Sequence, residues 1–581
     1  MRRIIPPATL AVAAVLLAAI SASAAPVRSA QATARPNIVF VMTDDQTQES
    51  LKVMARVRRD LIGRGTEFKR MMATYALCCP SRATYLTGQY SHNHGVIHNA
   101  GQFGGYTRLD HANTLPIWLH QAGYKTIHVG RYLNGYGTQN PNINEVPPGW
   151  DTWVSTVDPS TFNFRQWVMN ENGNLSLKPD LNRPDEHQTD YLGRRAAEEI
   201  IRSGPSPQPF FLSLTFPAPH SGSPIDPDDP PFLRTPSPAP RHRDFFSQLR
   251  LPLTPDFNEA DVFDKPQIVA DRAPIDGAMF AAIQENYRQE LESLLSVDDA
   301  VGSVIDALSR IGELGNTVII YTSDNGFFHG EHRVPSEKIL PYEPGIRVPM
   351  VIKGPGVPRG LKLGQLVGNI DWAPTVLEAA KASAQRRLDG TSLWRLLRDA
   401  TREPGRELVL ENGRGVNSVP QFRALRNNRF LYVRHDTTGE QELYDLRKDP
   451  YELNNLEDSR RYARIRGLLS RRLRALQNCR GSRCSASRPK VAMAVRELVR
   501  RGRRSRRAAS TRTRPVGSCA SRDVRLVLAG RERRRVELVR YFTGGRRLGV
   551  ARRRPFRLDV KRSKLGDGGT LRLRARVTTF D

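Results

Sequence analysis

Three long runs of apolar residues, each followed directly by polar side chains, limit the folds open to this chain more than any other feature of its sequence. The runs cover residues 37–43, 209–216 and 317–322. Unbroken apolar runs of this length are typical of strands that are covered on both faces, as in a parallel sheet. Segments with helical spacing of apolar residues lie between them, at 114–123 and 286–311. The sequence therefore predicts an α/β fold, with a large, mixed, mostly parallel sheet flanked by helices.

Polar side chains follow each predicted strand. Asp44 and Asp45 follow the first run, and His220 follows the second. Asp324 and Asn325 follow the third. Because ligands of such sheets bind beyond the carboxyl ends of the strands, we expect these side chains to lie close together. A set of oxygen donors that includes an amide favours Ca²⁺ or Mg²⁺ over zinc.

The N-terminus predicts export. Residues 1–25 begin with two arginines, continue with a mostly apolar stretch and end in small residues, as a secretory signal peptide does. An uncleaved anchor is the alternative, and no later stretch reaches about 18 consecutive apolar residues. We therefore expect a secreted, cell-surface or periplasmic protein. Outside the cytosol, Cys479 and Cys484 are candidates for a local disulfide.

Charge is distributed unevenly along the chain. Residues 485–581 hold 30 of the 88 Lys and Arg residues but only 7 of the 59 Asp and Glu residues. We predict a main α/β domain over 36–400 and a smaller C-terminal subdomain with an antiparallel sheet over 401–484. A basic linker over 485–522 and a β-rich, faintly immunoglobulin-like module over 523–581 follow. So basic a tail favours an anionic glycan or cell-surface polymer as partner; an exported protein is not expected to bind nucleic acid.

One short segment carries the most specific signal. Residues 78–88 read C-C-P-S-R-A-T-Y-L-T-G. They match all seven specified positions of C-x-P-S-R-x-x-x-L-T-G, and the chain here resembles the sulfatase family of the alkaline phosphatase superfamily. The resemblance extends from about residue 36 to residue 484. It implies that the chain is an enzyme that hydrolyses sulfuric esters.

The resemblance also implies how the chemistry proceeds. A formylglycine-generating enzyme would oxidise Cys78 to formylglycine, also called 3-oxoalanine. The aldehyde would be hydrated, and one hydroxyl of the hydrate would attack sulfur with help from a metal. The second hydroxyl would allow sulfate to be expelled as the aldehyde re-forms. Arg82 would fix the hydrate and add positive charge.

The same resemblance assigns the neighbouring residues. The metal would be calcium, with magnesium as the alternative. Its ligands would be Asp44, Asp45, Cys78, Asp324 and Asn325. His220 would contact sulfate or protonate the leaving oxygen, and Lys338 would also contact sulfate.

One segment departs from the common family pattern. Many sulfatases have G-K-W-H where this chain has G-R-Y-L-N at residues 130–134. Arg131 therefore replaces a catalytic lysine, and Leu133 stands where a histidine is usual. Apart from Arg131, this segment resembles the G-K-Y-L-N form of the N-acetylglucosamine-6-sulfatase branch, which also lacks that histidine, and the sequence around the signature resembles that branch as well. Further candidates for substrate contact are Asn134, His94 and His332, and more weakly His92 and His329. His92 and His94 have ordering of their own loop as an equal alternative.

The predicted substrate is a sulfated sugar, such as 6-sulfated N-acetylglucosamine of a glycosaminoglycan. Two alternatives remain open from the residues alone. A phosphonate or phosphodiester hydrolase of the same superfamily uses the same formylglycine. An inactive surface protein that binds polyanions through its basic tail is the alternative from another class.

Overall fold

The computed structural model describes residues 35–140, 142–227, 229–401, 406–413 and 419–484, together with six strands of the C-terminal segment. The predicted signal peptide, residues 1–25, lies outside the described residues. Within the part of the chain that is described, no helix is both long and apolar enough to cross a membrane.

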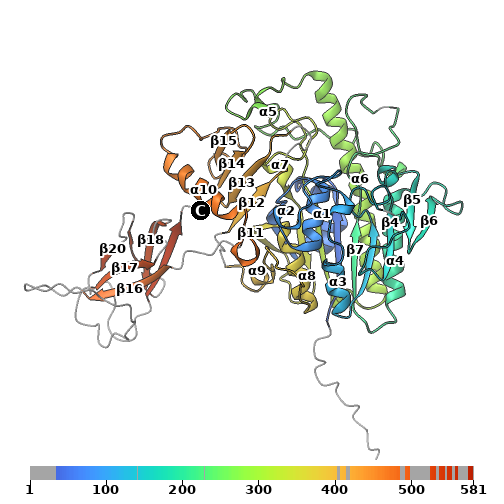
Figure 1. The fold of residues 1–581 in the computed structure, drawn as a ribbon, viewed down its shortest axis with the longest axis horizontal. Coiled ribbons are helices and arrows are strands. Elements are labelled where there is room, and N and C mark those ends of the chain that lie inside the picture. The colour runs from blue at the N-terminus through green and yellow to red at the C-terminus, as the bar shows by residue number, and fades with distance from the viewer. Residues whose placement is uncertain are drawn as a thin grey trace, which may run out of the picture. The chain divides into compact units, whose positions relative to one another are not determined.

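A sheet of eleven strands forms the centre of the molecule (Figure 1). Its strands, in chain order, are β1 (Asn37–Thr43), β2 (Thr66–Met72), β3 (Lys125–Gly130), β4 (Thr152–Thr156), β5 (Trp167–Glu171), β6 (Asn174–Lys178), β7 (Phe210–Thr215), β8 (Thr317–Ser323), β9 (Arg347–Val348), β10 (Met350–Lys353) and β11 (Leu361–Gly368). The spatial order is β11-β2-β10-β8-β1-β7-β3-β4-β5-β6, with β9 beside β2. All strands except β5, β9 and β10 run in the same direction. The predicted mixed, mostly parallel sheet is confirmed.

The central strand β1 is covered on both faces, as its apolar run predicts. Ile38, Phe40 and Met42 enter one core and Val39 and Val41 enter the other. This alternation follows from the two-residue period of a strand. It makes the domain a three-layer arrangement with the sheet in the middle.

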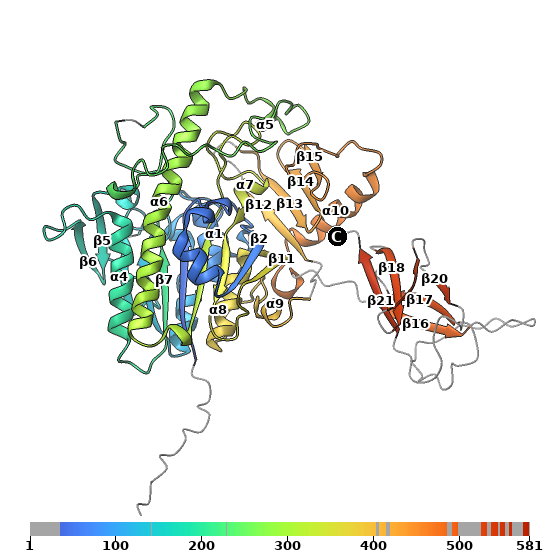
Figure 2. The same cartoon turned by 180° about the vertical axis from the view of Figure 1, so that it is seen from behind.

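Different helices cover the two faces of the sheet (Figures 1 and 2). The first core includes α1 (Cys78–Thr87), α3 (Leu115–Gln121) and α8 (Trp372–Ala380), and the second includes α4 (Gln188–Ser203) and α6 (Gly277–Arg310). Helix α6 begins nine residues before the predicted helix at 286–311. The reason is an N-cap, because the Asp276 side chain accepts a hydrogen bond from the backbone N–H of Met279 at 2.8 Å. The remaining α-helices of the described main domain are α2 (Ser91–His94), α5 (Gln267–Ala270), α7 (Glu343–Ile346) and α9 (Trp394–Arg398).

A separate antiparallel sheet of four strands follows, as predicted. It consists of β12 (Glu407–Glu411), β13 (Phe422–Asn427), β14 (Phe430–His435) and β15 (Gln441–Asp445), in that order. Helix α10 (Ala463–Leu476) contacts β13 and β14 and is followed by a disulfide between Cys479 and Cys484.

The C-terminal segment contains two antiparallel sheets of three strands. One contains β16 (Val491–Glu497), β17 (Val524–Gly530) and β20 (Arg557–Val560). The other contains β18 (Val536–Thr543), β19 (Arg546–Ala551) and β21 (Leu573–Thr579). Strand β16 lies inside the segment predicted as a linker, 485–522, where its backbone pairs with β17 in antiparallel register. The immunoglobulin-like character of this module stays a prediction.

Candidate active site

Two neighbouring strands bring the acidic residues together. Strands β1 and β8 are parallel, with Thr43 opposite Ser323, so the residues that follow them leave the same edge of the sheet side by side. Asp44, Asp45 and Asp324 each place a carboxylate oxygen within 4.8 Å of the others, and all three are buried. Three buried carboxylates at this spacing repel one another unless cations lie between them.

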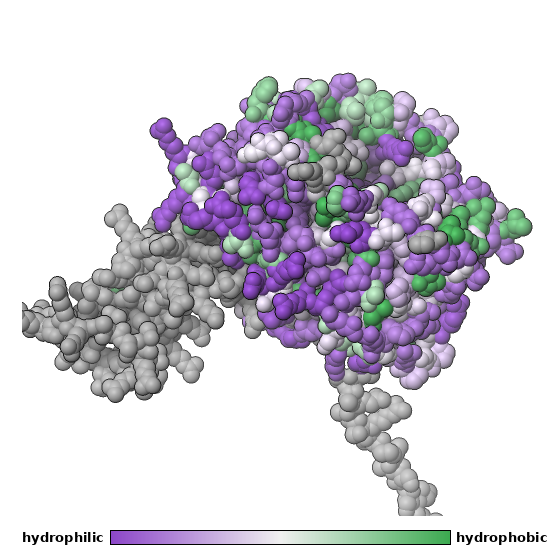
Figure 3. Space-filling model, viewed as in Figure 1, coloured by the Kyte–Doolittle hydropathy of each residue, from purple (hydrophilic) through white to green (hydrophobic). Residues whose placement is uncertain are grey.

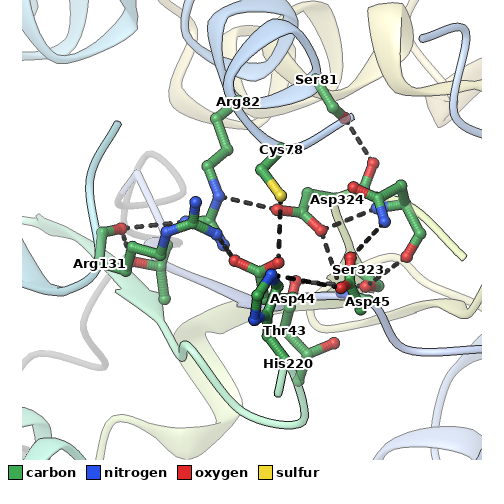
Figure 4. A network of polar contacts seen from close by, with 12 residues as sticks. Thr43, Asp44, Asp45, Cys78, Ser81, Arg82, Arg131, His220, Ser323 and Asp324 are labelled. Atoms are coloured by element: carbon green, nitrogen blue, oxygen red, sulfur yellow. Dashed lines mark hydrogen bonds and ion pairs between the residues drawn. The ribbon is translucent and has the colours of Figure 1, made fainter. Parts of the chain in front are cut away.

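Cys78 is the first residue of α1 and points into this acidic cluster (Figure 4). Its thiol Sγ lies 3.4 Å from Asp44 Oδ1, and Lys338 Nζ donates to it at 3.2 Å. Burial raises the pKa of the Cys78 thiol to about 12. The thiol is therefore protonated at neutral pH, in contrast to the thiolate of cysteine-dependent hydrolases.

Arg82 lies one turn after Cys78 on the same face of α1. Its Nε donates to Asp324 Oδ2 at 2.8 Å, and its Nη2 donates to Asp44 Oδ2 at 2.9 Å (Figure 4). The Nη1 group donates to the carbonyl of Arg131 at 3.0 Å. The planar guanidinium thus holds two carboxylates and a neighbouring loop in a fixed relation.

Lys338 provides a second buried cation. Its Nζ donates to both carboxylate oxygens of Asp45, at 2.6 and 2.7 Å. Burial alone would lower the pKa of Lys338, but Asp45 and other nearby negative groups raise it above its usual value. The side chain therefore carries its proton beside Cys78.

Arg131 provides a third cation, and its position depends on Gly130. Gly130 has φ of 116°, and a Cβ there would lie 1.8 Å from the carbonyl oxygen of Thr215. Only glycine fits this close approach. The Arg131 guanidinium then pairs with the Asp44 carboxylate and donates to Asn134 Oδ1 at 2.9 Å.

His220 lies on the loop after β7 and faces the same cluster. Its Nδ1 donates to the carbonyl of Ser221 at 2.7 Å, so Nε2 is left to face Asp45 Oδ2 at 3.6 Å. The ring stacks on Phe162, with centroids 4.2 Å apart, and the Arg131 guanidinium lies 4.7 Å from the centre of the same ring. Burial, followed by the charges of Lys338 and Arg131, lowers the pKa of His220 well below its usual value.

Two histidines that were predicted to contact the substrate form hydrogen bonds with other residues of the protein. His94 Nε2 lies 3.1 Å from Thr84 Oγ1, and its Nδ1 accepts from the backbone N–H of Val96 at 3.1 Å. These bonds favour the alternative in which His94 orders its loop. His332 is fully buried, and its Nδ1 lies 2.6 Å from Glu259 Oε2. Its role in substrate contact stays a prediction.

His92 and His329, the weaker candidates for substrate contact, also interact with other residues of the protein. His92 Nδ1 lies 2.8 Å from Glu411 Oε2, and its Nε2 donates to the carbonyl of Cys479 at 2.9 Å. His329 Nε2 lies 2.7 Å from Glu290 Oε2. Both histidines therefore link elements that are far apart in the sequence.

Sequence reasoning missed several residues that shape the site. Ser81 Oγ donates to the carbonyl of Asp324 at 2.5 Å and accepts from Asn369 Nδ2 at 2.9 Å. Asn99 binds the backbone at the start of α1, and Phe162 supports both His220 and Arg131. Ser81 lies within the signature, so its position signalled a role, whereas Phe162 and Asn99 gave no local signal.

Comparison with known proteins decides the family. The sulfatase family model matches residues 36–382, which is more than half of the chain. This chain belongs to the sulfatase family. It is a sulfuric ester hydrolase. A second model, described as the C-terminal part of N-sulphoglucosamine sulphohydrolase, matches residues 330–479 of this sulfatase.

Individual relatives agree with the family. An arylsulfatase of Volvox carteri is 32% identical over 510 residues, which cover 79% of this sulfatase and 77% of the relative. An N-acetylglucosamine-6-sulfatase of Capra hircus is 31% identical and covers 79% of this chain and 86% of its own. A solved structure in complex with its substrate D-glucosamine-2-N,6-O-disulfate superposes with a TM-score of 0.62 at 25% identity, over 76% of this chain and 97% of that one.

Proposed function

We propose that this sulfatase removes the 6-sulfate of N-acetylglucosamine or glucosamine units, using a formylglycine derived from Cys78 and a divalent metal. The observation that carries the proposal is the position of the Cys78 side chain, 3.4 Å from Asp44 and 3.2 Å from Lys338. The sulfur occupies the place that the oxygens of a hydrated formylglycine would take. Such a hydrate supplies an oxygen nucleophile that a buried, protonated thiol does not.

The residues present fit a divalent cation. Asp44, Asp45, Asp324 and Asn325 offer oxygen atoms only, the donor type that Ca²⁺ and Mg²⁺ prefer. Asn325 Oδ1 is buried without a hydrogen-bond partner among the described residues, and an unpartnered buried oxygen is costly unless a ligand fills the gap. We propose that these four residues hold Ca²⁺, with Mg²⁺ as the alternative. When bound, the cation would polarise the sulfuric ester and favour ionisation of a nearby hydroxyl.

The chain's own cations are placed to receive the substrate. Three cations border the cluster: Arg82 pairs with both Asp44 and Asp324, Arg131 pairs with Asp44, and Lys338 pairs with Asp45. A sulfate group brings negative charge into this buried setting, and fixed cations there stabilise the charge that builds up as the ester bond breaks. Among the described residues of the site, the Lys338 ammonium carries a proton and His220 Nε2 faces the cluster, so we propose these two groups as candidates to exchange a proton with the leaving oxygen.

Support for the sugar comes from the relatives and from one segment. The name of the Capra hircus relative and the ligand of the solved structure both concern 6-sulfated glucosamines. At residues 130–134 this chain has Arg131 held by Asn134 rather than the usual lysine and histidine. We propose that this pair faces the sugar beside the sulfate.

We further propose that the enzyme is exported and that residues 1–25 are removed. The disulfide between Cys479 and Cys484 supports this proposal, since such bonds persist in oxidising compartments. Mass measurement of the mature protein from its host tests it, and a mature chain that retains residues 1–25 would contradict it.

The test is to co-express the full chain with a formylglycine-generating enzyme and to measure sulfate and phosphate release. The substrates are 4-nitrophenyl sulfate, 4-nitrophenyl phosphate and 6-sulfated N-acetylglucosamine. Cys78→Ala is expected to abolish sulfate release, whereas the matched Cys79→Ser variant retains it. If phosphate is released faster than sulfate, the alternative function as a phosphonate or phosphodiester hydrolase is favoured. No release of either ion, with formylglycine confirmed by mass, would favour a binding protein.

A further inference from the structure

A second charged feature lies far from the acidic cluster. Residues 459–484 contain nine arginines and no Asp or Glu. A surface helix ordinarily mixes both signs, because opposite charges three or four residues apart stabilise it. In this segment all charged residues are arginines, so it lacks such stabilising pairs and its positive charges repel one another. Its composition therefore points to a partner that supplies the negative charge.

Helix α10 places two of these arginines on its solvent-facing side. Leu469, Leu473 and Leu476 are buried and pack against the second sheet. At 100° per residue, Arg471 and Arg474 lie on the opposite side of the helix, and both are exposed. Figure 3 shows that the surface in this part of the molecule is strongly hydrophilic.

Two other arginines of the segment have structural partners. Arg466 pairs with Glu457 at 2.6 Å, and Arg472 pairs with Glu407. Both are only half exposed. By contrast, Arg471 and Arg474 form no ion pair with any described residue. Arg466 and Arg472 thus hold the subdomain together, whereas Arg471 and Arg474 are open to solvent.

The disulfide loop extends the same surface. Arg480 and Arg483 lie between or beside Cys479 and Cys484, are exposed, and have no acidic partner in the described part of the chain. A Cβ placed on Gly481 would lie 3.5 Å from Cβ of Arg387, so a third exposed arginine adjoins the loop. The positive charge is therefore continuous from α10 to the loop that follows it.

This loop is fastened to the helix pair that carries the nucleophile position. The carbonyl of Cys479 accepts hydrogen bonds from His92 Nε2 at 2.9 Å and from Asn93 Nδ2 at 2.7 Å. Both donors belong to α2, which begins four residues after α1 ends (Figure 1). Helix α1 has ten residues and so spans about 15 Å. The arginine surface therefore meets the main domain at the end of α1 that lies away from Cys78.

We propose that Arg471, Arg474, Arg480 and Arg483 form a docking surface for a sulfated polysaccharide, which holds the polymer while one of its 6-sulfates occupies the active site. The inference rests on the proposed function and deepens it, since it makes the substrate a chain rather than a free sugar. Guanidinium groups match sulfate oxygens with paired N–H donors. A surface of four such groups beyond the far end of α1 meets sulfates that lie several sugar units from the reacting one.

The test compares two variants of the full chain that lose the same charge. The first replaces the four docking arginines (R471Q, R474Q, R480Q and R483Q). The control replaces four exposed arginines elsewhere (R250Q, R310Q, R359Q and R395Q). Kinetics are measured on 4-nitrophenyl sulfate and on 6-sulfated heparin oligosaccharides from two to twelve sugars. The docking variant is expected to raise KM about tenfold on the long oligosaccharides only, with kcat unchanged. An equal KM change in the control, or a change on the small ester, would overturn the proposal.

Binding separates this inference from the proposed function. The same two sets of substitutions are placed in the Cys78→Ala background, and affinity for heparin is measured at 0.15 M salt. Because both variants keep residues 485–581, the tail contributes equally to each. A loss of heparin affinity in the docking variant alone supports the surface even where wild type releases no sulfate. An equal loss for duplex DNA or for anionic vesicles would show a general charge effect and refute a polysaccharide site.

Discussion

The side-chain oxygen of Asn99 accepts a hydrogen bond of 3.0 Å from the backbone N–H of Cys79, in the first turn of α1. The first N–H groups of a helix have no partner within the helix. Leu77, the residue at the N-cap position, has no side-chain acceptor. Asn99 therefore performs from a distant loop the capping that the local sequence does not provide, and it fixes the backbone on which Cys78 sits.

We predict that Asn99→Ala lowers the free energy of unfolding by about 1 kcal/mol, the usual cost of losing a helix cap. It should also lower kcat for 4-nitrophenyl sulfate, because the Cys78 side chain is less firmly placed. Thermal unfolding and steady-state kinetics measure the two effects. Asn99→Asp keeps the acceptor and should retain most of both quantities. The exposed Asn144→Ala serves as control, and an equally small effect of Asn99→Ala would refute the capping role.

His220 gives a prediction about the leaving group. If its ring exchanges the proton of the departing oxygen, His220→Gln harms a sugar ester far more than 4-nitrophenyl sulfate, whose leaving group needs little help. We expect a loss of about 10²–10⁴-fold in kcat on 6-sulfated N-acetylglucosamine and a much smaller loss on the nitrophenyl ester. Equal losses on the two substrates would mean that His220 acts in substrate binding and that Lys338 protonates the leaving oxygen.

The proposed metal site predicts a change in stability that does not depend on activity. A ligand that binds only the folded protein stabilises it, by about 2.7 kcal/mol at one hundred times its dissociation constant. Ca²⁺ added to chelator-treated protein should therefore raise the Tm of wild type and leave that of Asp324→Asn unchanged. The exposed Asp271→Asn variant should respond as wild type does. If neither Ca²⁺ nor Mg²⁺ changes the Tm of the wild type, the proposed metal site is excluded.

The sequence predicts the sheet and the acidic cluster well because both follow from local signals. An apolar run indicates a buried strand, and the polar residues after it must then lie at the sheet edge. The pairing of Thr43 with Ser323 realises this for Asp44 and Asp324. Lys338 was predicted only from the family resemblance. It lies far from Asp45 in the sequence, so no local signal indicates the direct hydrogen bond between the two side chains.

The sequence did not allow the contacts made by loops to be predicted. Phe162 supports His220 and Arg131 at once, yet it lies in a short turn with no motif of its own. The pairing of His332 with Glu259 depends on how a long excursion folds back. Periodicity carries no information about such contacts, because loop positions depend on the packing of the whole domain.

The second sheet is tied to the segment that carries Lys338 by one buried carboxylate. Glu442 accepts hydrogen bonds of 2.7 Å from the hydroxyls of Tyr342 and Tyr444, and lies 2.8 Å from His435 Nε2. Glu442→Ala would leave these donors buried without an acceptor, and we predict a loss of about 3–5 kcal/mol in the free energy of unfolding. Denaturant unfolding measures it, with the exposed Asp271→Ala variant as control. A loss below about 1 kcal/mol would contradict the link.

Glu292 on α6 provides a pH-dependent prediction away from the active site. Its side chain is almost fully buried and accepts a hydrogen bond from the backbone N–H of Phe246 at 2.9 Å. Burial raises its pKa from an ordinary 4.5 to about 7, with Glu285 and Asp244 adding negative charge nearby. The folded protein therefore binds this proton more tightly than the unfolded chain does. Its contribution to stability is full below pH 4.5 and is lost as pH rises to about 7.

Glu292→Gln keeps a carbonyl acceptor for Phe246 but cannot ionise. Relative to wild type, we expect the variant to gain stability as pH rises from 5 to 7.5, by about 1–2 kcal/mol after allowance for solvent screening. Thermal unfolding at several pH values measures this difference, and Asp271→Asn controls for the loss of a surface charge. A difference between variant and wild type that stays constant over this range would mean that Glu292 does not titrate there. One that shrinks with rising pH would mean that its carboxylate is stabilised rather than penalised by its surroundings.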